Sequence, residues 1–233
     1  MTGPAGPPPT DDEAIQVQGY HRFRAPEGHS GQGILINTTR GNIFSLFHAT
    51  QTMDAAVLWV WGAGGGVTGP ADSIYVRLAE RLAGEGIASL RLDYRWPNDL
   101  YESVLDTLAG TTLLLGVGFK RLALVGHSFG GAVVIAAAPY NDKIVAVVGL
   151  SSQSAGAQRV SEVAPRPLLL VHGTDDAIIP VRASQFIYDL AGQPKELRCF
   201  QGAGHGLNEC REELNEILFG WLREKLAAPG YPS

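Results

Sequence analysis

The sequence predicts an α/β fold with a mostly parallel central sheet, helices on both faces and an antiparallel hairpin at its start. Short apolar runs alternate with amphipathic stretches of helical length, as in α/β proteins. Several of these runs lack polar alternation, which is typical of strands buried on both faces. The 233 residues suit a single domain. We expect it over residues 14–228, after a disordered, proline-rich tail at residues 1–13.

The first elements are predicted to be antiparallel strands. Residues 14–24 alternate loosely and suit an edge strand. Residues 33–37 and 43–47 are two further apolar runs, and Gly41-Asn42 between them is typical of a tight hairpin turn. We therefore expect an antiparallel opening to the sheet.

From residue 55 onward, the pattern changes to strands alternating with helices. The expected strands are residues 55–61, 87–93, 121–125, 144–150, 167–172 and 196–200. The expected helices are residues 72–83, 100–115, 128–138, 181–190 and 208–226. The inner stripe of the second helix is expected to hold Leu105, Leu108, Thr112 and Leu115. Functional residues of such sheets follow the carboxyl ends of the strands.

Composition argues against several kinds of partner. The formal net charge of −5 comes without a basic cluster, which disfavours nucleic acid and anionic membranes. No apolar run is long enough to cross a bilayer, and residues 1–9 lack the features of a signal peptide. The two cysteines, Cys199 and Cys210, are interpreted as small buried side chains in a reducing compartment. We therefore expect a cytoplasmic protein that acts on a small molecule.

The most informative motif is Gly126-His127-Ser128-Phe129-Gly130-Gly131. It has the pattern G-x-S-x-G and lies between an expected strand and an expected helix. In that setting the chain reverses sharply, and the serine hydroxyl is lifted out of the sheet. We therefore predict that Ser128 is a nucleophile. The alternative is that this segment is a glycine-rich turn between a strand and a helix, in which the serine has no catalytic role.

A serine nucleophile needs a base, and the base needs an acid to orient it. His205 lies in a glycine-rich loop after the last expected strand, so it is the predicted base. Asp175 and Asp176 both follow the strand at residues 167–172, and position alone leaves the acid open between them. His127 and His172 are interpreted as structural residues.

From about residue 33 to residue 226, the chain resembles the α/β-hydrolase family. The resemblance rests on the motif around Ser128 together with Trp61-Gly62-Ala63-Gly64-Gly65, Asp93-Tyr94-Arg95, His172-Gly173-Thr174-Asp175-Asp176 and Gly204-His205. It implies the α/β-hydrolase fold and a Ser128–His205–Asp176 triad. It also favours small, dienelactone-hydrolase-like members, although some of those use a cysteine nucleophile, which is absent here. Asp93 and Arg95 are expected to fix a loop.

The negative charge that develops on a substrate carbonyl needs preorganised donors. The backbone N–H of Phe129 is the first predicted donor. The resemblance implies a second from the loop after Trp61, with Ala63 preferred over Gly64. Trp61 replaces the histidine usual at its position. Gly64, Trp61 and Trp96 are candidate residues of the substrate pocket, against the alternative that the two tryptophans serve packing alone.

The expected activity is hydrolysis of carboxylic esters through an acyl-enzyme, without a metal or organic cofactor. About sixteen residues separate Leu150 from Pro167, too few for a large lid. An open site favours small or exposed esters over long-chain lipids. The alternatives are a thioesterase, lactonase, peptidase or acyltransferase with the same triad, or a non-catalytic binding protein on this fold. The oligomeric state and the natural substrate stay open.

Overall fold

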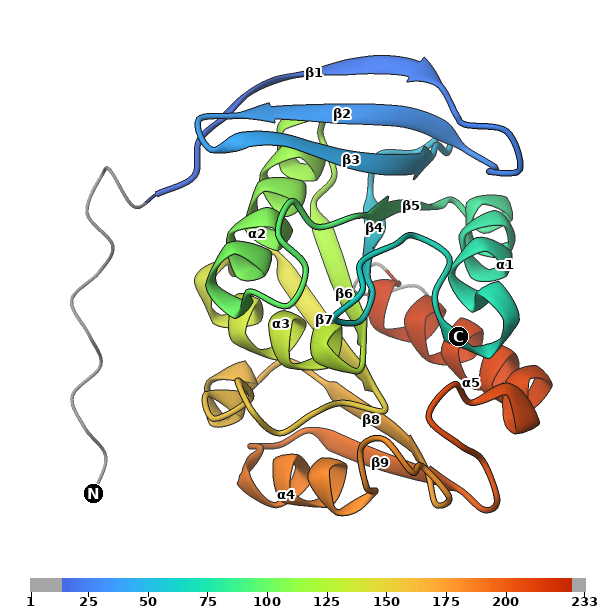
Figure 1. The fold of residues 1–233 in the computed structure, drawn as a ribbon. Coiled ribbons are helices and arrows are strands. Elements are labelled where there is room, and N and C mark those ends of the chain that lie inside the picture. The colour runs from blue at the N-terminus through green and yellow to red at the C-terminus, as the bar shows by residue number, and fades with distance from the viewer. Residues whose placement is uncertain (1–13, 228–233) are drawn as a thin grey trace.

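The computed structural model describes residues 14–227, and the expected tail at residues 1–13 lies outside this range. The described strands form one sheet in the order β1-β2-β3-β5-β4-β6-β7-β8-β9 (Figure 1). The strands are β1 (Val17–Arg24), β2 (Gln32–Thr38), β3 (Gly41–His48), β4 (Ala55–Val60), β5 (Ile87–Leu92), β6 (Arg121–His127), β7 (Ile144–Leu150), β8 (Leu168–Gly173) and β9 (Lys195–Phe200). The helices are α1 (Pro70–Gly84), α2 (Leu100–Gly116), α3 (Phe129–Ala137), α4 (Arg182–Leu190) and α5 (Arg211–Leu226), with 3-10 turns η1 (Ala138–Tyr140), η2 (Val160–Val163) and η3 (Asn208–Cys210).

The sheet is antiparallel at one end and parallel over the rest. Strands β1, β2 and β3 pair antiparallel, and β3 joins β5 in the same sense. Strands β5, β4, β6, β7, β8 and β9 pair in parallel. Every residue of β4, β5 and β8 is buried, in line with their uninterrupted apolar sequences. The predicted fold class is therefore confirmed.

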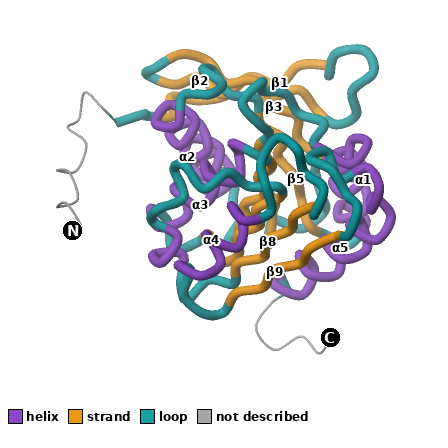
Figure 2. The backbone as a smooth tube through the Cα atoms, turned by 60° about the horizontal axis from the view of Figure 1, so that its bottom comes forward, coloured by secondary structure: helices purple, strands orange, loops and turns teal. Residues whose placement is uncertain are grey.

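Helices cover both faces of the sheet (Figures 1 and 2). One apolar cluster joins α2, α3 and α4 to one face and contains Leu58 of β4 and Leu124 of β6. The other joins α1 and α5 to the opposite face and contains the neighbouring Trp59 and Val125. Because successive residues of a strand point to opposite faces, each central strand contributes to both clusters. The central strands are therefore covered by an apolar layer on each face.

Two local predictions are wrong. Thr38 pairs with Gly41, so the two-residue hairpin turn is Thr39-Arg40 rather than Gly41-Asn42. The Thr38 side chain fixes this turn, since its Oγ1 donates to Gly41 O at 2.5 Å and accepts from Arg40 N at 3.1 Å. Cys199 was expected to be buried but is exposed, because β9 is the edge strand of the sheet. Cys210 is partly buried.

The predicted stripe of α2 is also wrong at Thr112, which is exposed. The helix packs against both the sheet and α3, so its buried surface is wider than a single stripe. Gly110 faces the sheet, where an added Cβ would come within 2.5 Å of Leu58 and 2.9 Å of Leu92. Small residues therefore set how near α2 comes to the strands.

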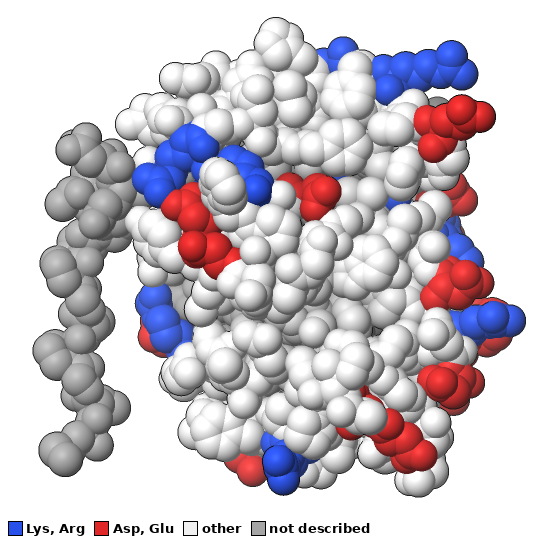
Figure 3. Space-filling model, in the orientation of Figure 1, with Lys and Arg blue, Asp and Glu red and all other residues white. Residues whose placement is uncertain are grey.

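The connection from β7 to β8 is short. Residues 151–167 contain only the turn η2, so the part of the chain that the structure describes has no large lid at this position. None of the described helices is long and apolar enough to cross a membrane. On the face shown in Figure 3, acidic and basic side chains form small separate groups around a broad area without them.

Candidate active site

Ser128 lies in a sharp turn between β6 and α3. Its backbone has φ 60° and ψ −119°, a conformation that non-glycine residues rarely adopt. The turn leaves no room beside it. A Cβ at Gly126 would lie 2.0 Å from the carbonyl oxygen of Gly130, and a Cβ at Gly130 would lie 2.2 Å from that of Trp61. The glycines of the G-x-S-x-G motif are therefore required by close backbone packing.

Three side chains that are distant in sequence meet at this turn. His205 Nε2 lies 3.1 Å from Ser128 Oγ, and His205 Nδ1 lies 2.7 Å from Asp176 Oδ2. The three residues follow β6, β8 and β9, whose parallel pairing brings their carboxyl ends to one edge of the sheet. The structure therefore brings together the serine, histidine and aspartate that the sequence singled out.

Of the two neighbouring aspartates, only Asp176 contacts His205. The exposed Asp175 accepts a hydrogen bond from Thr174 Oγ1 at 2.9 Å. Asp176 Oδ1 accepts from the backbone N–H groups of Ile178 at 2.9 Å and Ile179 at 2.8 Å. Burial raises the pKa of Asp176, but hydrogen bonds from His205, Ile179 and Ile178 outweigh it and the pKa lies below its ordinary value. Asp176 is therefore an anion at neutral pH.

A second imidazole contacts the same carboxylate. His172 Nε2 lies 3.1 Å from Asp176 Oδ2 and 2.8 Å from the carbonyl oxygen of Ile179. His172 Nδ1 lies 2.7 Å from Ser184 Oγ in α4. Since a carbonyl only accepts, Nε2 carries a proton and can donate towards both oxygens. His172 was interpreted as a structural residue and makes these local hydrogen bonds, but its contact with Asp176 was missed. The spacing of four residues between His172 and Asp176 is the sequence feature that could have indicated this contact.

His127 supports His205 from the other side. The two rings are 4.8 Å apart between centroids, and His127 Nε2 donates to the backbone oxygen of His205 at 3.0 Å. Burial lowers the pKa of His127 to about 4, so the ring is neutral at pH 7. Its Nδ1 is buried and has no hydrogen-bond partner among residues 14–227. His127 is thus a packing and anchoring residue, as the sequence indicated.

The start of α1 anchors the His205 loop. The N–H of Ala71 donates to Gly206 O at 2.7 Å, and the N–H of Asp72 donates to Asn208 Oδ1 at 3.1 Å. Ala71, Asp72 and Ser73 have φ values of 49°, 55° and 65°, which place three consecutive non-glycine residues in the left-handed region. A strained turn therefore presents two amides to the loop that carries His205.

The loop after β4 passes directly over Ser128. A Cβ at Gly62 would lie 3.5 Å from Ser128 Cβ and 3.8 Å from its Oγ. Asp93 fixes this loop, because its Oδ1 accepts from Gly66 N at 2.6 Å. Ala63 and Gly64 follow Gly62 at the exposed part of the loop. Their amides follow directly after Gly62 in the chain, and Phe129 is the first residue of α3.

Two further predicted residues are the candidate pocket tryptophans, Trp61 and Trp96. Trp61 is partly buried, and its ring packs under Gly66, where a Cβ would come within 2.9 Å of it. Trp96 is 62% exposed.

Asp93 and Arg95 do not bind one another. Arg95 instead pairs with Asp106 at 2.5 Å and with Glu102 at 2.8 Å, which ties the loop after β5 to α2. Both are loop-fixing residues, each through its own partners.

Comparisons with known proteins agree with this architecture. Residues 77–220 match the model of the dienelactone hydrolase family. The curated Escherichia coli O157:H7 protein YfhR is 33% identical over a stretch covering 34% of this chain and 36% of that protein. The chain thus spans about a third of the length of this relative.

Several solved structures share the fold. A dienelactone hydrolase from Anabaena variabilis has a TM-score of 0.72 and 17% identity, covering 89% of this chain and 99% of its own. Est1E from Butyrivibrio proteoclasticus has a TM-score of 0.70 and 19% identity, covering 85% of this chain and 100% of its own. An alpha-beta serine hydrolase homologue from Coxiella burnetii has a TM-score of 0.69 and 19% identity, covering 84% and 100%. With the family match spanning more than half of its length, this chain belongs to the dienelactone hydrolase family and has the α/β-hydrolase fold.

Proposed function

We propose that the protein is a serine hydrolase that cleaves carboxylic esters through an acyl-enzyme intermediate. In this proposal Ser128 is the nucleophile, His205 the general base and Asp176 the residue that orients His205. The observation that carries it is the continuous chain of contacts from Ser128 Oγ through His205 to Asp176, at 3.1 Å and 2.7 Å. Such a chain activates a hydroxyl that is otherwise a weak nucleophile at neutral pH.

The first half of the reaction acylates Ser128. Its Oγ attacks the ester carbonyl carbon while His205 Nε2 accepts the hydroxyl proton. The imidazolium that forms is stabilised by the anionic Asp176 at Nδ1. The carbonyl oxygen becomes an oxyanion. When the tetrahedral intermediate collapses, the C–O bond to the leaving group breaks and His205 Nε2 returns the proton to the departing alkoxide.

The second half repeats these steps with water. His205 removes a proton from a water molecule, whose oxygen attacks the acyl carbon. Collapse of the new intermediate breaks the bond to Ser128 Oγ, which recovers its proton from His205. The carboxylic acid then leaves. Proton donors and acceptors balance over the cycle, so the chain's own side chains suffice for every proton transfer.

The oxyanion is proposed to accept hydrogen bonds from the amides of Phe129 and Ala63. The first opens α3, so it also benefits from the positive end of the helix dipole. The second follows Gly62, which lies against Ser128. Proline at one position removes one N–H, so Ala63→Pro and Gly64→Pro separate the two loop candidates. Loss of about 100-fold or more in kcat is expected for Ala63→Pro alone. A larger loss for Gly64→Pro would reassign the donor to Gly64.

The substrate is proposed to be a small or exposed ester. The short β7–β8 connection supports this, because it leaves the serine uncovered by a large lid. Trp61 and Trp96 are the proposed aromatic contacts beside it, together with Gly64. A series of p-nitrophenyl esters from acetate to palmitate tests the length preference, and a best substrate at the long end would contradict it. A ferulate ester belongs in the same panel, since Est1E has been solved with ferulic acid bound.

A fluorophosphonate probe tests the catalytic proposal most directly. The wild-type protein should be labelled covalently, and folded Ser128→Ala should not. No labelling of the folded wild type would instead favour a binding protein on a hydrolase fold. Parallel assays with oxygen esters, thioesters, lactones, amides and acyl-acceptor alcohols then separate esterase action from thioesterase, lactonase, peptidase and acyltransferase action. Higher kcat/KM for thioesters, lactones or amides would overturn the ester assignment but keep the triad.

A further inference from the structure

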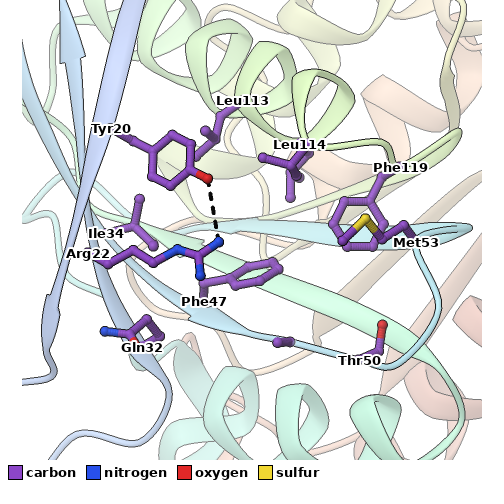
Figure 4. A pocket seen from close by; sticks show the side chains of 12 residues that line it. Tyr20, Arg22, Gln32, Ile34, Phe47, Thr50, Met53, Leu113, Leu114 and Phe119 are labelled. Carbon is purple, nitrogen blue, oxygen red and sulfur yellow. Dashed lines mark hydrogen bonds between the residues drawn. The ribbon is translucent and has the colours of Figure 1, made fainter.

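A cavity of about 290 Å³ lies between the antiparallel strands and the last turns of α2 (Figure 4). Its walls come from β1, β2 and β3, the connection from β3 to β4, and the segment that follows α2. The apolar lining consists mainly of Ile34, Phe47, Met53, Leu113, Leu114 and Phe119. None of these residues takes part in the proposed ester hydrolysis.

The cavity lies at the amino ends of the parallel strands, whereas Ser128 lies at their carboxyl ends. Met53 lies just before β4 and Phe119 just before β6, so both belong to the amino ends of parallel strands. Ser128 follows the carboxyl end of β6. A strand rises about 3.3 Å per residue. The six residues of β4 therefore separate the amino ends of the strands from the carboxyl ends by about 20 Å. A molecule in this cavity would not contact the Ser128 hydroxyl.

A cation lies over the apolar part of the cavity. Arg22 and Tyr20 project from the same face of β1, two residues apart, and Figure 4 shows the guanidinium between Tyr20 and Phe47. Arg22 donates weakly to Tyr20 Oη at 3.4 Å and lies 5.7 Å from the centre of its ring. Within residues 14–227, no carboxylate forms an ion pair with it. Its charge is therefore open to an anion from solution.

The cavity also leaves apolar surface in contact with water. Met53 is 57% exposed and Tyr20 is 36% exposed. A ligand that covers these side chains gains free energy in proportion to the apolar area it removes from water. An engineered cavity of about 150 Å³ binds benzene, so a cavity of about 290 Å³ has room for a ligand of about ten non-hydrogen atoms. That is the size of a medium-chain fatty acid such as octanoate.

We propose that this cavity binds a small apolar carboxylate. The hydrocarbon part fills the space between Phe47 and Leu113, and the carboxylate pairs with the Arg22 guanidinium. Arginine suits this role because its planar fork matches the two oxygens of a carboxylate. An apolar body with one anionic end satisfies both the lining and the unpaired cation, whereas an amine would be repelled and an alcohol would lack the ion pair.

Isothermal titration of the full chain with octanoate, octan-1-ol and octylammonium tests this assignment. Octanoate should bind with a stoichiometry of one, octan-1-ol about three- to tenfold more weakly, and octylammonium not at all. Arg22→Gln is an exposed substitution and should bring octanoate to the level of the alcohol. Leu113→Trp should fill the cavity and abolish binding of both.

Two results would overturn the assignment. One is the absence of binding at millimolar octanoate. The other is an octanoate affinity equal in wild type, Arg22→Gln and folded Leu113→Trp, which would place the ligand elsewhere, for example as a product at Ser128. Ser128→Ala should bind octanoate as the wild type does. This result is independent of ester hydrolysis, because it holds even if fluorophosphonate labelling fails.

Discussion

His172 Nε2 and Asp176 Oδ2 are 3.1 Å apart in the core of the structure, and the same oxygen faces His205 Nδ1 at 2.7 Å. His172 is fully buried and held by Ser184 in α4. Both carboxylate oxygens of Asp176 therefore face N–H donors. Several contacts together fix the orientation of this side chain towards His205. In the proposed reaction His172 is a positioning residue, since it acts through Asp176 and does not touch the reacting atoms.

Replacing His172 should slow turnover with little effect on substrate binding. His172→Leu removes one hydrogen-bond donor to Asp176. The expected rise in the activation free energy is about 1 kcal/mol, which corresponds to a roughly five- to tenfold lower kcat. His172→Gln keeps an N–H group near the position of Nε2 and should recover most of the rate. Steady-state kinetics with p-nitrophenyl acetate measure the split between kcat and KM. Equal kcat for folded His172→Leu and the wild type would remove His172 from the positioning network.

Asp176→Asn and Asp175→Asn form a matched pair of neighbouring substitutions. An amide at residue 176 cannot stabilise the imidazolium of His205, so kcat should fall by about 10³- to 10⁴-fold. The exposed Asp175 side chain accepts a hydrogen bond from Thr174 and does not contact His205, so its substitution should change kcat by less than about twofold. The comparison is made on ester hydrolysis and on the rate of fluorophosphonate labelling. A larger loss at residue 175 would transfer the acid role to Asp175.

The glycines of the turn at Ser128 should tolerate no side chain. A Cβ at Gly126 meets backbone atoms of Gly130 at 2.0 Å, and backbone cannot move aside as a flexible side chain can. Gly126→Ala should therefore destabilise the fold by about 3 kcal/mol or more. Gly116→Ala is the control, because nothing lies within 4 Å of its Cβ position at the end of α2. It should be neutral or stabilising by up to about 1 kcal/mol. Urea denaturation followed by circular dichroism gives both values.

Stability should fall as the pH is lowered from about 6.5 towards 4. Burial lowers the pKa of both His127 and His48 to about 4, and nearby Arg91 adds to the effect at His48. In this window the unfolded chain binds protons at both residues and the folded chain does not, so acid favours unfolding. The loss from His127 alone is at most about 3 kcal/mol.

Urea midpoints at pH 7 and pH 5 measure this loss, and His127→Gln should show a smaller difference than the wild type. Most carboxylates stay ionised at pH 5, so they contribute little to the comparison. Identical midpoints at the two pH values would contradict the neutral, buried state of these histidines.

Much of the fold was predictable because apolar periodicity reflects burial directly. The uninterrupted apolar run at residues 55–61 predicted a central strand, and β4 lies in the middle of the sheet. The turn at Thr39-Arg40 was placed two residues too late, since glycine is the stronger turn signal but the Thr38 side chain fixes the register. Thr112 was assigned to the wrong face because α2 is covered on two sides.

The candidate site was predictable where residues follow strand ends. The positions of Ser128, His205 and the two aspartates came from this rule, and the choice of Asp176 came from the resemblance. The contact between His172 and Asp176 was not predictable in the same way, since it depends on how the turn after β8 folds back. The cavity near Arg22 could not be predicted either, because it needs β1, β3 and α2 to be packed together.

The left-handed turn at Ala71, Asp72 and Ser73 joins the opening of α1 to the His205 loop through Gly206 and Asn208. Residues in this conformation relax towards ordinary helical angles once their hydrogen-bond acceptors leave. Transient opening of either segment should thus release the other, and hydrogen exchange should report both as one cooperative unit. The lifetime of the assembled site would then be set by a stretch of chain more than 50 residues before Ser128.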